Sequence, residues 1–261
     1  MNWFYAYANP LRFENAARKL QPWLFGAAFV LLGGGFFLAL FSSPPDYQQG
    51  DTVRIMYVHV PAAWMAMFCY TVMAVSSIVG FVWKHPLADV AAKATATVGA
   101  AFTLLALITG SLWGKPMWGA WWVWDARLTS VLVLFFLYLG YIALWQAIED
   151  THRAARAAGI LAIVGFVNVP IIKFSVDWWN SLHQPASVTR LDGTITIDSS
   201  FLTPLLVMGV AYMALYAALL LLRMRTEVLE RRLHRLQQDR VAEANVPHRR
   251  PAGGKLGEVP S

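Results

Sequence analysis

Long stretches without a charged residue dominate this sequence and restrict what it can fold into. Six apolar windows lie at about 22–42, 62–83, 94–114, 128–148, 157–176 and 199–222. Each is close to the roughly 20 residues that an α-helix needs to cross about 30 Å of hydrocarbon. Only 14% of the residues are charged, against about 25% in a typical soluble domain. The sequence therefore predicts an all-α integral membrane protein with six transmembrane helices.

The fifth window is the weakest of the six. It contains Pro170 and has Lys173 near its end, whereas the other five windows carry no charge. A lysine close to a helix end can extend its ammonium group to the membrane surface. We therefore keep the window as a transmembrane helix, with a broken or polar feature at Asn168-Val169-Pro170.

The distribution of lysine and arginine predicts the orientation. Six spans place both termini on one side, and 16 of the 21 basic residues fall there, against five on the other side. Without the C-terminal tail the split is seven against five, which is weaker but has the same sign. Cytoplasmic segments carry the excess of positive charge in membrane proteins. Both termini are therefore expected in the cytoplasm.

The chain divides into a membrane domain and a tail under this topology. Residues 1–225 form the six-helix domain, with outer loops at 43–61, 112–127 and 174–198. Residues 226–245 have Leu229, Leu233 and Leu236 at helical spacing among charges, which predicts a cytoplasmic extension of the last helix. Residues 246–261, rich in Pro, Gly and Arg, are expected to be disordered. In the third outer loop, alternation around Asp192-Gly193 predicts a short hairpin.

Composition also excludes several function classes. Cys69 is the single cysteine and lies in an apolar window, so it is expected to be a small buried residue. One thiol forms no intramolecular disulfide, no cysteine-based zinc site and no C-x-x-C-H site for covalent haem. No basic face on a soluble module is visible, so we predict no nucleic-acid partner.

Tryptophan is concentrated in the second outer loop. Five of the twelve tryptophans lie between Trp113 and Trp124, with glycines among them, and Trp178 and Trp179 follow in the third loop. An aromatic belt at the membrane surface explains tryptophans near any helix end. A local cluster equally fits a platform for a planar aromatic ligand. The residues alone leave both interpretations open.

Two of the six histidines lie in the outer loops on either side of this cluster. They are His59 and His183, and the other four fall in cytoplasmic segments. A histidine in such a place is often a helix cap or a solvated residue, but a pair suggests a shared metal or cofactor. Zinc would need a third protein ligand. Iron in a porphyrin needs only axial ligands from the protein, and two histidines supply both.

Three charged residues of the outer loops complete the candidate site. Arg54 precedes His59 and Arg127 follows the tryptophan cluster, so either guanidinium could bind the propionates of haem. Anchoring at the membrane surface explains both arginines equally well. Asp125 could cap the fourth span or pair with Arg127, and we favour a structural role of this kind.

The segment from Trp118 to Asp125 reads W-G-A-W-W-V-W-D. It resembles the W-G-x-x-W-x-W-D signature of the tryptophan-rich haem-handling membrane proteins of cytochrome c maturation. The resemblance covers about residues 20–225, including the six spans and a histidine in each flanking outer loop. The larger members of that family have more spans and extra histidines within the membrane. No apolar window here contains a histidine, so the chain is similar to the small member.

The resemblance implies roles for particular residues. His59 and His183 match the axial ligands of a non-covalently held haem b. The signature that binds the macrocycle matches Trp118, Gly119, Trp122, Trp124 and Asp125. We add four tryptophans from their position alone, namely Trp113, Trp121, Trp178 and Trp179.

The resemblance also implies a location and partners. Members of the family lie in the bacterial inner membrane and present haem at the periplasmic face to the chaperone CcmE, which becomes linked to a haem vinyl group. They work in an ABC-type complex with CcmA, CcmB and CcmD. This sequence has no G-x-x-x-x-G-K-[ST] motif, so a partner would hydrolyse ATP. We expect a haem-presenting scaffold rather than a conventional enzyme.

Three other functions compete with this interpretation. A membrane electron-transfer subunit would place histidines within its spans. A small-molecule permease would favour broken or polar helices at the midplane, and only Asn168-Val169-Pro170 has that character. A purely structural subunit would use the tryptophans as an aromatic belt. No apolar window contains a histidine, which counts against the electron-transfer subunit, and the permease leaves the tryptophan cluster unexplained.

Overall fold

The computed structural model describes residues 9–184, 187–188 and 193–244. These residues fold into the helices α2 (Pro10–Phe37), α3 (Met56–Trp83), α4 (Ala88–Trp118), α5 (Ala126–Ala147), α6 (Thr151–Gly165), α7 (Asn168–Trp178) and α8 (Ser199–Ala244). A π-helical turn, Leu38–Ser42, extends α2, and a 3-10 turn, Asp51–Ile55, precedes α3. With α6 and α7 forming one span, six helices are long and apolar enough to cross a membrane, which confirms the predicted number.

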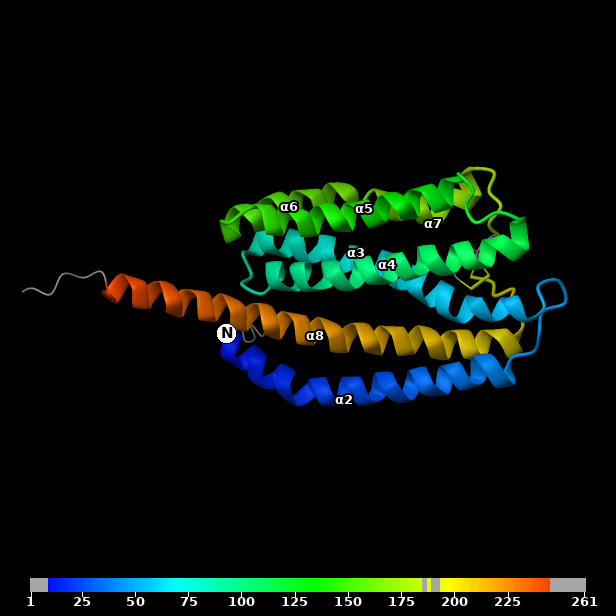
Figure 1. Cartoon of the computed structure of the whole chain (residues 1–261), viewed down its shortest axis with the longest axis horizontal. Coiled ribbons are helices and arrows are strands. Elements are labelled where there is room, and N and C mark those ends of the chain that lie inside the picture. Colours follow the sequence, from blue (N-terminus) through cyan, green and yellow to red (C-terminus); the bar gives the residue numbers. More distant parts are fainter. Residues whose placement is uncertain (1–8, 185–186, 189–192, 245–261) are drawn as a thin grey trace, which may run out of the picture.

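The helices lie roughly parallel in three layers (Figure 1). α3 and α4 pack against each other in the centre, α2 packs against α8 on one side, and α5 with α6 and α7 forms the other side. Alanine, glycine and tyrosine fill much of the interior: Ala66, Ala96 and Tyr138, for example, have almost no exposed surface. Small residues allow close approach of helix backbones within a membrane. Cys69 is buried in this core, as predicted.

The helices are longer than the apolar windows, so the outer loops are shorter than expected. α3 begins at Met56, α4 continues to Trp118 and α7 to Trp178, beyond the ends of the corresponding apolar windows. The described residues between these spans that lie outside the helices are therefore 43–50, 119–125, 179–184, 187–188 and 193–198. His59 consequently lies in the first turn of α3 and not in a loop, and a span does contain a histidine. The hairpin expected around Asp192-Gly193 lies largely outside the described residues.

The fifth span is interrupted where the sequence is weakest. α6 ends at Gly165 and α7 begins at Asn168. Pro170 has no N–H to donate to the carbonyl of Phe166, and its ring clashes with that carbonyl in a continuous helix. The Asn168 side chain donates from Nδ2 to the backbone oxygen of Ser130 at 2.8 Å. This hydrogen bond links the break to α5 within the protein.

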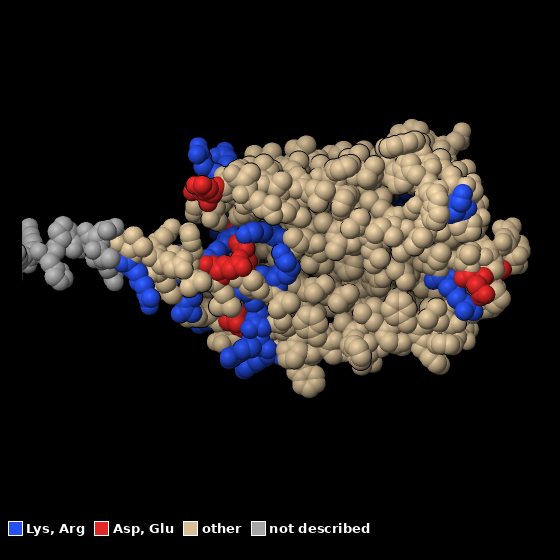
Figure 2. All heavy atoms as spheres, in the orientation of Figure 1, with Lys and Arg blue, Asp and Glu red and all other residues tan. Residues whose placement is uncertain are grey.

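α8 continues past the membrane domain to Ala244 and is fixed by ion pairs where it leaves the bundle. The buried Glu227 accepts from Lys93 at 2.6 Å and from Arg231 at 2.7 Å, and Arg231 also binds Asp89 at 2.7 Å. Charged side chains gather at this end of the molecule, around α8 (Figure 2). α2 begins at the same end, whereas the segments 43–50, 119–125 and 179–184 lie at the opposite end (Figure 1).

Candidate functional site

A cavity of about 340 Å³ opens among the helix ends opposite the start of α2. Its size is at the lower end of the range of small-molecule sites, roughly 300–1,000 Å³. Residues of α3, α4, α5, α7 and α8 line it, together with described residues of the segments between these helices. Aliphatic and aromatic side chains predominate, and the polar or charged members include Gln49, His59, Arg127, Lys173, His183 and Gln184.

His59 enters the cavity from the first turn of α3. Its Nδ1 lies 3.0 Å from the backbone oxygen of Ala106 and 3.2 Å from Thr109 Oγ1, both on α4. Because the carbonyl can only accept, the contact with Ala106 assigns the imidazole proton to Nδ1. No described residue pairs with Nε2 of His59, which leaves that nitrogen as the atom able to bind a metal.

The glycine at position 110 makes room for this ring. A Cβ added to Gly110 would lie 2.9 Å from His59 Cε1 and 3.4 Å from His59 Nδ1. The first distance is too short for any side chain at this position without a shift of the imidazole. α4 therefore positions His59 in two ways. The Ala106 carbonyl and the Thr109 hydroxyl contact Nδ1, and Gly110 leaves the space that the ring needs.

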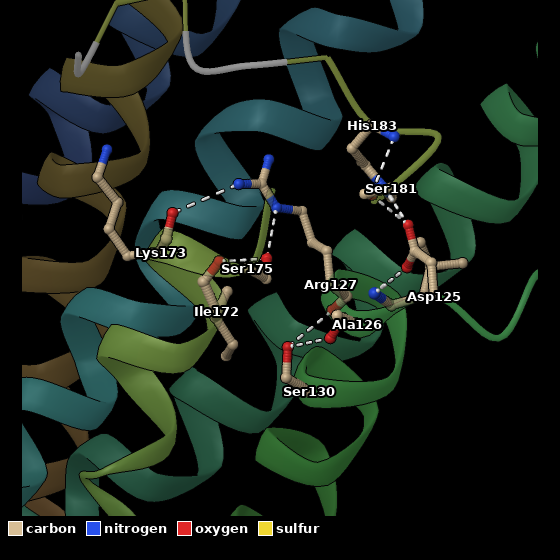
Figure 3. Close-up of polar contacts among 10 residues, drawn as sticks. Asp125, Ala126, Arg127, Ser130, Ile172, Lys173, Ser175, Ser181 and His183 are labelled. Atoms are coloured by element: carbon tan, nitrogen blue, oxygen red, sulfur yellow. Dashed lines mark hydrogen bonds and ion pairs between the residues drawn. The ribbon is translucent and has the colours of Figure 1, made fainter. Parts of the chain in front are cut away.

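His183 approaches the same cavity from the segment that follows α7. Its Nδ1 lies 3.0 Å from Asp125 Oδ2, and its backbone N–H donates to Ser181 Oγ at 3.1 Å (Figure 3). Burial lowers the pKa of His183 below its ordinary value, and the hydrogen bond with Asp125 offsets this only in part. The ring is therefore a neutral imidazole at pH 7. With the proton on Nδ1, facing the carboxylate, its Nε2 is the free nitrogen.

Asp125 holds two parts of the chain together. Its Oδ1 accepts from the backbone N–H of Leu128 at 2.7 Å and so caps α5. Its Oδ2 accepts from the Ser181 hydroxyl at 2.6 Å as well as from His183. Burial opposes ionisation of Asp125, but these hydrogen bonds outweigh it and bring its pKa below the ordinary value. Asp125 is therefore a carboxylate that organises the site from behind His183.

Three tryptophans of the sequence cluster line the cavity, Trp113, Trp118 and Trp122. The Trp113 ring meets the His59 ring edge-on with centroids 5.7 Å apart, and its indole N–H donates to Gln49 Oε1 at 2.9 Å. The Trp118 ring meets the His183 ring edge-on at 4.9 Å. Each candidate ligand is thus packed against one indole.

The other tryptophans of the prediction lie away from the cavity lining. Trp121, Trp124, Trp178 and Trp179 are each at least half exposed, and Trp124 reaches 75%. The Trp121 backbone oxygen accepts from Ser111 Oγ at 2.7 Å, and the Trp124 ring packs edge-on against Trp122. These four indoles have the exposure expected of an aromatic belt.

Gly119 shapes the turn between α4 and the tryptophan segment. It follows the last residue of α4 with φ of +74°, in the left-handed region that favours glycine. Its carbonyl accepts from Lys115 Nζ at 3.0 Å. Gly119 is absent from the cavity lining, so its part in the signature is to reverse the chain and bring Trp122 back to the cavity.

The two predicted arginines separate in the structure. Arg127 lines the cavity and donates from Nε to Ser175 Oγ at 3.3 Å and from Nη2 to the Lys173 carbonyl at 3.4 Å (Figure 3). Arg54 lies outside the lining and pairs with Asp51 at 3.2 Å. Lys173 itself also lines the cavity. Positive charge is therefore supplied to the cavity from α5 and α7.

Several supporting residues escape sequence reasoning. Gln49, Thr109, Gly110 and Ser181 fix the candidate ligands or their aromatic neighbours, and Trp64 of α3 also lines the cavity. The contacts of Gln49, Thr109 and Ser181 each need a polar atom at one three-dimensional position. No local spacing in the sequence encodes such a position. The described residues contain no group of three or more His, Cys, Asp or Glu able to hold a metal ion.

Comparison with known proteins gives one consistent family. Residues 3–239 match the family model described as Heme exporter protein C. The protein of that name from Bradyrhizobium diazoefficiens is 58% identical over 230 residues, covering 88% of this chain and 87% of the relative. The one from Escherichia coli K12 is 51% identical over 222 residues, covering 85% and 89%. The matched residues extend through all six spans and every cavity-lining segment.

Proposed function

Because the chain belongs to the Heme exporter protein C (CcmC) family, we propose that it binds haem in this cavity and presents it to a partner protein. It is a multi-pass membrane protein of haem export in cytochrome c biogenesis. The observation that carries the proposal is the pair of imidazoles in one cavity, each with Nδ1 engaged and Nε2 left for iron.

The donor set suits iron in a porphyrin better than a bare ion. Haem brings four nitrogen ligands of its own and requires only axial ligands from the protein. His59 and His183 are two such ligands, held on separate elements that face one cavity. Binding by two imidazoles leaves no open position for oxygen chemistry, which suits a non-covalently held haem b in transit.

The cavity wall also suits the rest of the haem molecule. Trp113, Trp118 and Trp122 offer indole surfaces to the macrocycle. The Trp122 indole N–H is buried and has no acceptor among the described residues, and a propionate oxygen would satisfy it. Arg127 and Lys173 add positive charge to the lining. Arg54, Trp178 and Trp179 lie outside the lining and have no direct part in this arrangement.

The haem site is assigned to the periplasmic face of the inner membrane. Charged side chains gather at the end where α2 begins (Figures 1 and 2). Six spans put 16 of the 21 basic residues on that side of the membrane, and cytoplasmic segments carry such an excess. The cavity lies at the opposite end. The exposed indoles of Trp121, Trp124, Trp178 and Trp179 would then mark the outer membrane–water interface.

The partner that receives haem is the chaperone CcmE, and the chain works beside CcmA, CcmB and CcmD. A cavity at the membrane surface leaves a haem edge within reach of a periplasmic protein. The chaperone's own histidine forms the bond to a haem vinyl group, so this chain acts as a scaffold. Holding both reactants in place accelerates that step without a catalytic side chain.

Covalent loading of the chaperone tests this function. In cells that depend on this chain, His59→Ala/His183→Ala should reduce haem-linked CcmE in membranes by at least about 100-fold. Loss of a single hydrogen-bond partner of a metal-bound histidine already costs roughly 10–100-fold in metal affinity. His152→Ala, which changes an exposed histidine at the start of α6, is the matched control and should leave loading unchanged. Normal loading by the double variant at equal protein levels would refute the proposal.

A smaller effect is expected from Gly110→Ala. The new Cβ would displace the His59 ring and weaken its hydrogen bond to Ala106. Loss of one hydrogen bond, about 1 kcal/mol, predicts haem affinity lowered by roughly 5- to 10-fold. The helix itself should not suffer, because alanine is favoured over glycine by about 1 kcal/mol in a helix interior.

Haem titration of the detergent-purified protein, followed by absorption, measures this change. Gly33→Ala is the matched control, because a Cβ at that position of α2 meets nothing within 4 Å. Equal affinities for Gly110→Ala and Gly33→Ala would show that His59 does not need the space at Gly110.

A further inference from the structure

The contacts behind His183 assign a role to Asp125 that is distinct from contact with the macrocycle. We propose that Asp125 is a positioning residue, which fixes the orientation and the tautomer of His183 so that Nε2 is presented to iron. The proposal rests on the proposed function, because it presumes His183 as an axial ligand. It predicts that the carboxylate acts on haem only through the imidazole.

The two oxygens of Asp125 have separate tasks. Oδ1 accepts from the backbone N–H of Leu128 at 2.7 Å, and Oδ2 accepts from His183 Nδ1 at 3.0 Å. The Asp125 side chain is only 5% exposed and the His183 side chain 19%. The N-terminus of α5 is therefore the rigid support to which the imidazole is attached.

Ser181 adds a second connection between Asp125 and His183. Its hydroxyl donates to Asp125 Oδ2 at 2.6 Å and accepts from the His183 backbone N–H at 3.1 Å. Asp125 thus fixes both the ring of His183 and, through Ser181, its backbone (Figure 3). A ring held at both points has little freedom to rotate, and a carboxylate facing Nδ1 requires the proton there.

The two candidate ligands are supported by different chemistry. His59 donates to a neutral backbone carbonyl, whereas His183 donates to a carboxylate. A carboxylate acceptor raises the electron-donating strength of a metal-bound imidazole. His183 is therefore the stronger donor of the two, and it stabilises ferric iron more than His59 does.

The first test replaces the Asp125 carboxylate by an amide and keeps the hydrogen bond that caps α5. Asp125→Asn retains an oxygen for Leu128, since asparagine caps helices about as well as aspartate, but the NH2 group that replaces Oδ2 can accept from neither Ser181 nor His183. We expect haem affinity roughly 10- to 100-fold lower, the usual cost of removing an outer-shell partner. The midpoint potential should become more positive, and part of the haem should become high-spin.

Asp150→Asn is the matched control for the first test. Asp150 caps α6 in the same way, by accepting from Arg153 N–H at 2.7 Å. This change removes the same charge from the same kind of cap, so it should leave the affinity, the potential and the spectrum unchanged. A wild-type potential and affinity in Asp125→Asn would overturn the proposal.

The second test measures the contribution of the hydrogen bond between His183 Nδ1 and Asp125. In His183→Gly, added imidazole can occupy the vacated space, bind iron and donate its N–H to Asp125, whereas N-methylimidazole has no N–H to donate. We expect the ratio of their affinities, measured by absorption titration, to favour imidazole. In the double variant Asp125→Asn/His183→Gly this ratio should fall by about 10-fold, which corresponds to roughly 1.4 kcal/mol.

The outcomes separate this proposal from the function on which it rests. An unchanged ratio in the two backgrounds, with low-spin haem in the wild type, overturns the role of Asp125 alone. A wild type that never shows low-spin haem overturns both the role of Asp125 and the axial pair.

Discussion

Replacing both candidate ligands, in His59→Ala/His183→Ala, should weaken haem binding by more than about 100-fold. Loss of one outer-shell partner of a metal ligand already costs roughly 10–100-fold, and this change removes both protein bonds to iron. The remaining contacts are indole surfaces and the charges of Arg127 and Lys173, which supply affinity without fixing the metal. Titration of the purified protein with haem measures the dissociation constant.

The fold should survive this double change. His59 and His183 line the cavity, so the helical circular dichroism and the melting temperature should be close to those of the wild type. The control variant His152→Ala should show the same circular dichroism, melting temperature and haem affinity as the wild type. A dissociation constant within a few-fold of the wild type would show that the tryptophans alone hold the ligand.

Removing Glu227 should destabilise the folded protein. The carboxylate of Glu227 is buried between Lys93 and Arg231, at 2.6 Å and 2.7 Å. Both cations also lie over the Trp145 ring. Glu227→Ala leaves Lys93 without this partner, and breaking a buried pair costs roughly 3–5 kcal/mol. Because the Lys93 side chain is 36% exposed and Arg231 keeps Asp89, we expect about 3 kcal/mol, near the lower end.

Thermal unfolding in detergent, followed by circular dichroism, measures this loss. Glu230→Ala is the matched control, since Glu230 is an exposed glutamate on the same helix, and exposed substitutions usually change stability by less than about 0.5 kcal/mol. If Glu227→Ala unfolds at the same temperature as Glu230→Ala, the ion pairs around α8 do not stabilise the membrane domain.

The sequence predicted the number of spans well because hydrocarbon imposes a simple requirement. Each window needed about 20 apolar residues. Five windows became parts of long helices, and the remaining one, the fifth, became the pair α6 and α7. The helix ends were harder to predict, because polar residues continue a helix outside the hydrocarbon as well as apolar ones do. For this reason α3 includes His59, and α4 includes Trp113 and Trp118.

The candidate site was predictable in its ingredients but not in its contacts. The spacing of W-G-x-x-W-x-W-D singles out the tryptophan segment, yet Trp122 faces the cavity while the neighbouring Trp121 and Trp124 are exposed. Side chains of a non-helical segment follow no fixed period, so sequence alone does not assign their directions. The link from Asp125 to Ser181 joins residues far apart in the chain, and only the packing of α5 beside the segment after α7 reveals it.

The absorption spectrum of the haem-loaded, detergent-purified protein is the most direct test of the central claim, that His59 and His183 are the axial pair. Axial ligation by these two histidines predicts a low-spin spectrum for the wild type, and a shift to high-spin haem in both His59→Ala and His183→Ala. A low-spin spectrum that neither change alters would contradict the account, because the iron would then have ligands other than these two imidazoles.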